Sequence, residues 1–214
     1  MRLALFDIDD TLIRGDCEVL WSRYLTREGL YDMSEIERFC AEYHAGTLDY
    51  DAFTRFQLAP LAALDAEVVR EHRQRFLDDE IAPLVCELLQ ERVADHRERG
   101  DVLVAISAAH DFLAKPISRM AGIETGLYTL AERNGRSFTG RTSGRQCFRE
   151  GKIGCLEDWL TENDLDWNDL EDTWFYSDSH NDLPLLRKVV HPVVVRPDDA
   201  LRKVAERDAW ELIE

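Results

Sequence analysis

The sequence predicts an α/β fold built on a doubly wound, mainly parallel sheet. Short apolar segments alternate with longer segments of helical periodicity, which is the pattern of such a sheet. Each apolar segment is continuous rather than alternating, as expected for a strand that helices cover on both faces. The predicted strands are residues 3–6, 102–107, 173–177 and 192–196, and the predicted helices are 82–99, 111–121, 152–163 and 181–189.

Residues 15–79 interrupt this alternation with four successive segments of helical periodicity and no convincing strand. Asp49 and Asp65 are suited to cap two of these helices, and Gly29 and Gly46 are suited to end two of them. We therefore expect a helical cap subdomain at 15–79. The predicted Rossmann-like core is discontinuous and comprises residues 1–14 and 80–214. The alternative is that the four helices are additional helices of the core.

A small β-hairpin is expected late in the chain. Asn134 and Gly135 lie between β-prone residues, and this dipeptide is typical of a two-residue hairpin turn. The hairpin would stand outside the regular strand–helix alternation.

Composition restricts the class of partner. The 214 residues carry a net charge of −17, from 43 acidic and 26 basic residues, which argues against nucleic acid or an anionic membrane as a partner. Five cysteines without a C-x-x-C pair make a zinc site improbable and favour the reducing cytoplasm. No apolar run approaches the roughly 18–20 residues that span a bilayer, and the apolar start is too short for a signal peptide. We expect a cytoplasmic monomer or homodimer.

Acidic residues crowd the end of the first predicted strand, as Asp7, Asp9 and Asp10. In an extended segment, residues two apart point to the same side, so Asp7 and Asp9 would face one spot. Ligands bind where parallel strands end, and Ser107 and Asp178 follow two other strands. Because like charges repel, a cation is needed, and the oxygens of Asp7, Asp9 and Asp178 suit Mg²⁺.

Lys152 begins the helix between Ser107 and Asp178. Its charge and the Ser107 hydroxyl match phosphate oxygens, which favours a small phosphorylated metabolite as the partner. Each residue alone has a simpler explanation, because a serine often caps a helix, a surface lysine is usually solvated, and Asp178 and Asp182 suit a turn. Their occurrence together and in order favours a functional site.

These residues resemble four motifs of the haloacid dehalogenase superfamily. The motifs are FDIDDTL at 6–12, Ser107, Lys152 and SDSHNDLPLL at 177–186. The similarity is greatest to the phosphoserine-phosphatase-like group, which carries a helical cap. The resemblance implies a Mg²⁺-dependent phosphomonoester hydrolase that acts on a small metabolite.

The resemblance also implies roles for single residues. Asp7 would be the nucleophile that forms an aspartyl-phosphate, and Asp9 the general acid and base. Ser107 and Lys152 would hold the phosphoryl oxygens. The remaining implied roles are metal binding by Asp7, by the Asp9 carbonyl and by Asp178, orientation of the metal site by Asp182, a place near the phosphate for Asn181, and contact with a substrate amine for Asp16. His110 and His180 lie near the motifs without an implied role.

The sequence departs from this group where the cap would meet the substrate. Phosphoserine phosphatases hold the substrate carboxylate with an arginine, but Gln57 occupies the corresponding position. Arg55 lies two residues earlier and would be rotated by about 200° on a helix. A neutral glutamine cannot form a charge-assisted clamp on a carboxylate. We therefore expect a substrate with an amine or imidazole but no carboxylate, such as histidinol phosphate.

Other functions remain open. Within the same fold, the alternatives are phosphoserine phosphatase itself and a phosphotransferase or mutase. A different class is the phospho-receiver signalling domain, which also uses a phosphorylated aspartate, Mg²⁺ and a lysine. Receiver domains place their phosphoacceptor on a later strand, and they are about half as long as this chain.

Overall fold

The computed structural model describes residues 1–214 apart from the side chain of His44. It contains a seven-stranded sheet in the order β4-β3-β2-β1-β5-β6-β7, and every neighbouring pair is parallel except β3 with β4. The predicted fold class is confirmed. The strands are β1 (Arg2–Phe6), β2 (Val102–His110), β3 (Thr125–Asn134), β4 (Ser137–Ser143), β5 (Asp172–Ser177), β6 (His191–Val195) and β7 (Glu211–Ile213).

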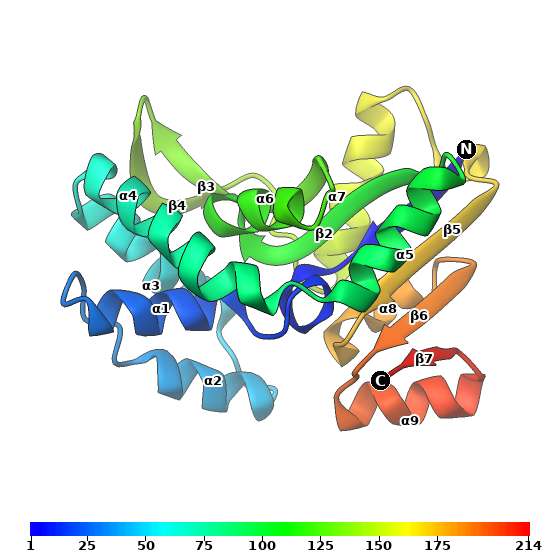
Figure 1. The fold of residues 1–214 in the computed structure, drawn as a ribbon, viewed down its shortest axis with the longest axis horizontal. Helices are drawn as coiled ribbons and strands as arrows, with labels where there is room; N and C mark the ends of the chain where they lie inside the picture. The colour runs from blue at the N-terminus through cyan, green and yellow to red at the C-terminus, as the bar shows by residue number, and fades with distance from the viewer.

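Helices cover both faces of the sheet (Figure 1). Alternate residues of the central strand β1 belong to different apolar clusters, because successive side chains of a strand point to opposite faces. Ala4 and Phe6 pack on the side of α5 and α6, and Leu3 and Leu5 pack on the side of α7, α8 and α9. The bounds of these helices are α5 (Glu87–Glu98), α6 (Asp111–Met120), α7 (Glu150–Glu162), α8 (Leu183–Leu186) and α9 (Asp199–Asp208).

Two predicted helices are interrupted. The segment 82–99 begins with a 3-10 turn, Ala82–Leu84, and α5 starts only at Glu87, because Val85 pairs with Ile13 in an antiparallel bridge. The segment 181–189 divides into a 3-10 turn, His180–Asp182, and the short α8.

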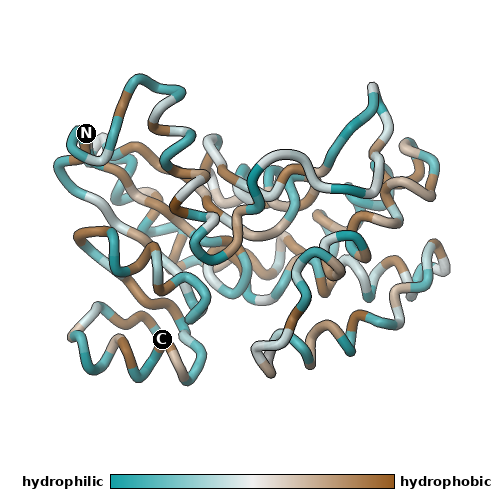
Figure 2. The backbone as a smooth tube through the Cα atoms, turned by 180° about the vertical axis from the view of Figure 1, so that it is seen from behind, coloured by the Kyte–Doolittle hydropathy of each residue, from teal (hydrophilic) through white to brown (hydrophobic). Residues whose placement is uncertain are grey.

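Two elements lie outside the predicted set, the three-residue edge strand β7 and α9, along which hydrophobic and hydrophilic residues alternate (Figure 2). The first strand of the predicted hairpin, β3, also pairs in parallel with β2 and so joins the main sheet, which was not predicted. The β3–β4 hairpin is confirmed, but its loop is one residue later than predicted. Asn134 pairs with Ser137, so the loop is Gly135 and Arg136, and Gly135 has a φ of 62°.

The insert contains the four predicted helices, α1 (Cys17–Arg27), α2 (Ile36–His44), α3 (Tyr50–Ala63) and α4 (Ala66–Phe76). The Asp49 and Asp65 side chains accept hydrogen bonds from backbone amides at the starts of α3 and α4, as predicted. Gly29 and Gly46 follow α1 and α2 with φ values of +67° and +71°, which favour glycine at helix ends.

The chain enters and leaves the insert beside the acidic loop. Arg14 N donates to Leu84 O at 2.8 Å, and Cys86 N donates to Leu12 O at 2.9 Å. Arg196, directly after β6, donates to the carbonyls of Asp10 and Thr11. The boundaries of the cap at 14/15 and 79/80 stay a prediction, but these bonds fix its point of attachment next to Asp7 and Asp9.

The insert packs on the core through aromatic rings. Trp21 of α1 lies 5.2 Å from Phe76 and 6.0 Å from Phe112 of α6, measured between ring centroids. At the other end α3 packs on β4, where a Cβ at Gly140 would lie 3.2 Å from the Ala62 side chain. These contacts hold the insert over the carboxyl ends of β2 and β3 (Figure 1).

Candidate active site

Lys152 joins two carboxylates at the carboxyl edge of the sheet. Its Nζ donates to Asp7 Oδ1 and to Asp182 Oδ2, both at 2.7 Å. Asp7 follows β1, Lys152 lies in the first turn of α7, and Asp182 ends the 3-10 turn after β5. Ser177 Oγ donates to the same Asp182 oxygen at 2.6 Å. The structure thus brings together three sequence-predicted residues that are each at most 6% exposed.

Burial sets the charges of this cluster. It raises the pKa of Asp7 to about 7, against the opposing effect of the Lys152 charge. Burial alone would lower the pKa of Lys152, but Asp182 and Asp7 raise it above its ordinary value. Lys152 is therefore a cation, and its proton donors are directed at the predicted nucleophile.

The segment after β1 is extended only in part, whereas the sequence predicted an extended segment. Residues Ile8–Leu12 form a turn closed by the bond from Ile13 N to Ile8 O, in which Asp9 keeps an extended backbone (φ −66°, ψ 135°) and the chain turns at Asp10. Asp10 has a φ of 49° and is exposed, as expected for a solvated loop acid. Asp9 Oδ1 accepts from Cys17 N at 2.8 Å, so the Asp9 carboxyl group is held at the start of α1.

The negative charges of the Asp9 and Asp178 carboxylates are not offset by a nearby cation among the described residues. Burial, followed by the charges of Asp16 and Asp7, raises the pKa of Asp9 well above its usual range. For Asp178 burial is again the largest cause, followed by the charges of Asp7, Asp10 and Asp182. Asp178 Oδ1 accepts a long hydrogen bond of 3.4 Å from Thr11 Oγ1.

No three His, Cys, Asp or Glu side chains of the described residues are grouped so that they could hold a metal ion. The predicted ligands face different partners, because Asp182 binds Lys152 and the Asp9 side chain binds α1. A site with two carboxylates, the carbonyl of Asp9 and water ligands does not require three such side chains. The metal assignment stays a prediction.

The other predicted residues have partners outside the cluster. Ser107 is 1% exposed, and its Oγ accepts from Ala109 N at 3.1 Å. Asn181 Oδ1 accepts from Arg149 Nε at 2.8 Å, and its Nδ2 donates to Tyr43 OH at 3.0 Å. Asp16 is exposed, and its Oδ1 caps α1 by accepting from two backbone amides at 2.9 Å.

The structure adds site residues that the sequence did not single out as ligands or catalysts. Tyr43 of α2 reaches across to the core, where its hydroxyl lies 3.1 Å from Ser179 Oγ. Tyr50 of α3 donates to Ala108 O at 2.8 Å, directly after Ser107, and stacks on Phe148. Their only signal in the sequence was the helical spacing of aromatic residues, which also describes an apolar core.

Neither Arg55 nor Gln57 is placed as a charged ligand for a substrate carboxylate. Arg55 is exposed on the surface of α3. Gln57 is fully buried, and its Oε1 accepts from Ser22 Oγ at 2.9 Å. Of the two histidines near the motifs, His180 binds Asp198 at 2.7 Å, and His110 is buried beside Glu18.

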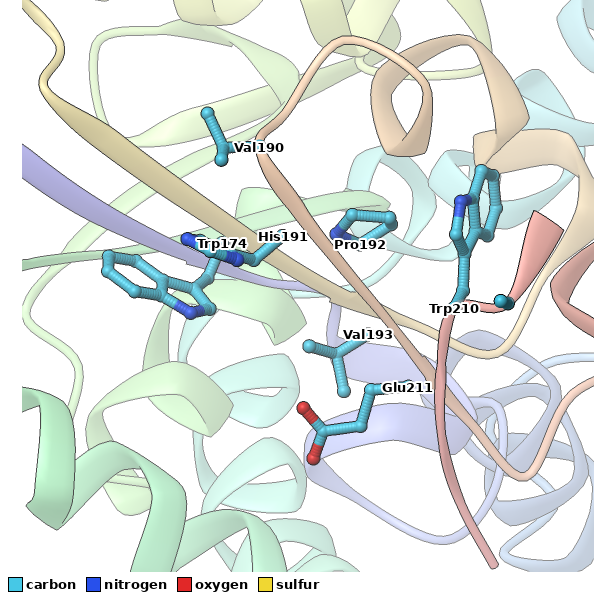
Figure 3. A pocket seen from close by; sticks show the side chains of 8 residues that line it. Trp174, Val190, His191, Pro192, Val193, Trp210 and Glu211 are labelled. Carbon is cyan, nitrogen blue, oxygen red and sulfur yellow. The ribbon is translucent and has the colours of Figure 1, made fainter.

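Two surface hollows lie away from this cluster. One, of about 290 Å³, lies along β5, β6 and β7, and its lining includes His191, which stacks on Trp174, and Trp210 (Figure 3). The other, of about 410 Å³, lies between Arg73 and Arg133. Neither is lined by a sequence-predicted site residue, so the buried charges, rather than these hollows, locate the candidate active site.

Comparison with known proteins is consistent with this site. The model of the haloacid dehalogenase-like hydrolase family matches residues 4–187, which include Asp7, Ser107, Lys152 and Asp182. The chain belongs to the haloacid dehalogenase-like hydrolases. It is 39% identical to a protein named histidinol-phosphatase from Neisseria meningitidis serogroup C (strain 8013), over 99% of this chain and 98% of the relative.

Solved structures share the fold of this hydrolase. A crystal structure of a protein of unknown function from Bordetella pertussis Tohama I has a TM-score of 0.93 at 33% identity, over 100% of this chain and 98% of that one. A substrate-bound phosphoserine phosphatase has a TM-score of 0.73 at 20% identity, over 100% of this chain and 92% of that one. The hydrolase is a phosphatase of the phosphoserine-phosphatase-like group, as predicted. Within the described residues, no helix combines the length and apolar character needed to cross a membrane.

Proposed function

We propose that this hydrolase is a Mg²⁺-dependent phosphatase that cleaves histidinol phosphate through an aspartyl-phosphate intermediate. The observation that carries the proposal is the buried Asp7–Lys152–Asp182 cluster at the carboxyl edge of the sheet. A lysine held between two carboxylates is positioned to receive phosphoryl oxygens next to the nucleophile.

In this proposal Asp7 attacks the phosphorus atom through the carboxylate oxygen that Lys152 does not hold. The bond from phosphorus to the leaving oxygen breaks, and Asp9 donates a proton to the departing alcohol. The raised pKa of Asp9 favours the protonated form that this step needs. Asp9 then takes a proton from the water that attacks the aspartyl-phosphate, which releases inorganic phosphate and restores Asp7. Lys152 and Ser107 hold the phosphoryl oxygens throughout.

The acidic residues fit a hard divalent cation. Asp7 and Asp178 would bind it with their carboxylates and Asp9 with its backbone carbonyl, since Mg²⁺ prefers oxygen ligands and retains several waters. When bound, Mg²⁺ would supply positive charge that offsets the repulsion between these groups and the phosphate. Asp182 instead holds Lys152, which suits a positioning role beside the metal.

Removal of divalent metal is expected to abolish the hydrolysis of p-nitrophenyl phosphate. The measurement is the release of nitrophenol before and after complete chelation, followed by addition of Mg²⁺ or Ca²⁺. Mg²⁺ should restore activity, and Ca²⁺ should restore little, because its larger and looser shell displaces the nucleophile. Undiminished turnover after chelation would contradict the metal assignment.

The choice of substrate rests on the cap and on the relatives. Arg55 lies on the exposed side of α3, and Gln57 is neutral and buried with its Oε1 bound by Ser22 Oγ, so neither suits the charged clamp that a carboxylate requires. The Neisseria relative named histidinol-phosphatase matches from end to end, including the cap. Both observations support an amino-alcohol phosphate rather than phosphoserine.

Histidinol phosphate is expected to give a kcat/KM at least tenfold above that of phosphoserine. The measurement is inorganic phosphate release from both substrates, with Arg55→Ala assayed beside the native protein. If each substrate molecule consumed releases one inorganic phosphate, the reaction is hydrolysis. Phosphotransfer would release less phosphate than the substrate consumed. A clear preference for phosphoserine that disappears in Arg55→Ala would show that the enzyme is a phosphoserine phosphatase instead.

A further inference from the structure

Two buried polar side chains lie beside the catalytic cluster without ordinary partners. Glu18 of α1 is 9% exposed, and His110 at the end of β2 is 1% exposed. Glu18 Oε1 accepts from His110 N at 3.0 Å, and His110 Nε2 lies 3.3 Å from the same oxygen. Neither ring nitrogen of His110 makes a hydrogen bond with any described residue. Buried polar groups are normally paired, so this arrangement requires an explanation.

Glu18 also lacks a positive charge. Burial, assisted by the charge of Asp16, raises the pKa of Glu18 to about 8. Burial lowers the pKa of His110 to about 4, so its ring is neutral at pH 7 and does not compensate Glu18. In the described part of the chain, the partner within ion-pair distance of Glu18 is this histidine and no lysine or arginine. At pH 7 Glu18 is therefore largely protonated when no ligand is bound, and a cation that binds beside it would stabilise the carboxylate that burial disfavours.

Asp16 differs from Glu18 in both respects. It is exposed, and its Oδ1 already accepts from the amides of Glu18 and Val19 at the start of α1. Burial raises the pKa of Asp16 too, but the backbone amides of Val19 and Glu18 and the charge of Arg23 oppose this effect. Of the two acids at the start of α1, Glu18 is therefore the less compensated one.

Glu18 lies close enough to the predicted phosphate-binding residue Ser107 for one small substrate to reach both. His110, to which it binds, is three residues beyond Ser107, and three extended residues span at most about 11 Å. Tyr50 lies beside this segment, because its hydroxyl donates to the carbonyl of Ala108, between Ser107 and His110, at 2.8 Å. About one tenth of the Glu18 side chain, 11%, remains exposed.

We propose that Glu18 is the specificity-determining residue that receives the cationic group of the substrate, with the neutral His110 ring as a second polar contact. The ligand class is a phosphomonoester whose alcohol carries a protonated amine or imidazole. This inference rests on the proposed function of the same site and assigns its cation-binding end.

The test compares Glu18→Gln with the native enzyme on three substrates. They are histidinol phosphate, phosphoethanolamine as a second cationic phosphomonoester, and p-nitrophenyl phosphate, which has no cation. Glutamine keeps the shape and the acceptor for His110 N but removes the charge. We expect the ratio of kcat/KM for histidinol phosphate to that for p-nitrophenyl phosphate to fall roughly tenfold or more. Inhibition by L-histidinol should weaken similarly, and inhibition by inorganic phosphate should not.

The matched control is Glu28→Gln, the same substitution at an exposed acid that follows α1, which should preserve the ratio. Asp16→Asn tests the competing assignment, because the resemblance implies Asp16 as the contact for a substrate amine. An unchanged ratio in Glu18→Gln, or a fall confined to Asp16→Asn, would overturn the assignment. A native enzyme without preference for either cationic substrate would also overturn it. If phosphoethanolamine is the better substrate and Glu18→Gln loses that preference, the role of Glu18 stands and histidinol phosphate as substrate falls. Thermal unfolding of all three variants checks that they are folded.

Discussion

Asp7→Asn is expected to lower kcat for histidinol phosphate by on the order of 10⁵-fold or more, as when other hydrolases lose a covalent nucleophile. An amide cannot attack phosphorus to form the aspartyl-phosphate. Among the described residues, the other carboxylate that Lys152 binds is Asp182, which has no proposed role as a nucleophile. The measurement is phosphate release in single- and multiple-turnover assays. In the native enzyme, acid quenching should also trap a phosphorylated protein that is absent in the variant.

Asp10→Asn is the matched control. Asp10 is exposed in the same loop, and its φ of 49° is a conformation that asparagine adopts readily. This variant should retain kcat within a few-fold, because its side chain has no proposed role. If Asp7→Asn keeps a near-native kcat, the covalent mechanism is wrong even if the protein is a phosphatase.

Lys152→Ala is expected to have the second largest effect, a fall in kcat/KM of about 10²–10³-fold. The loss has two causes. The phosphoryl oxygens lose a charged donor, and Asp7 is left beside Asp182 without the cation that now separates them. Removal of one partner of a buried ion pair also destabilises a protein by roughly 3–5 kcal/mol, so activity should be measured well below the unfolding midpoint.

Lys188→Ala provides the comparison for this effect. Lys188 forms a partly exposed ion pair with Glu157 at 2.7 Å, which contributes about 0–1 kcal/mol in general. Its removal should leave both kcat/KM and the unfolding temperature nearly unchanged. A loss below about threefold in Lys152→Ala would show that Lys152 has a structural role only.

The sequence predicted where the candidate site residues that follow strands would lie, but not their roles. Asp7, Ser107 and Asp178 were predicted because ligands gather where parallel strands end, and that inference needs only the apolar segments. Lys152 lies 145 residues from Asp7, and the motif order alone related them. The edge strand β7 and the polar helix α9 escaped prediction because their own patterns are weak and their stability comes from packing at the sheet edge.

The contacts of the insert could not be predicted in the same way. Glu18 and Tyr50 reach the end of β2 across 92 and 58 residues of sequence, so their contacts depend on how the cap docks. The turn at Ile8–Leu12 was missed because its closing bond, from Ile13 to Ile8, competes with the extended conformation that the strand suggested. The hydrogen bond from Ser22 to Gln57 could not be predicted either, because helical spacing does not show which residues of neighbouring helices meet.

The hydrogen bond from Cys17 N to Asp9 attaches the proposed proton donor to the first helix of the insert. That helix cannot tilt away from the sheet unless it stretches the 2.8 Å bond or carries the carboxyl group with it. The same helix bears Glu18 one residue later. In this proposal, a molecule that is too large, or that leaves Glu18 without a partner, would shift α1 and move the Asp9 carboxyl group away from the leaving oxygen. The position of one helix would then affect both substrate recognition and proton transfer.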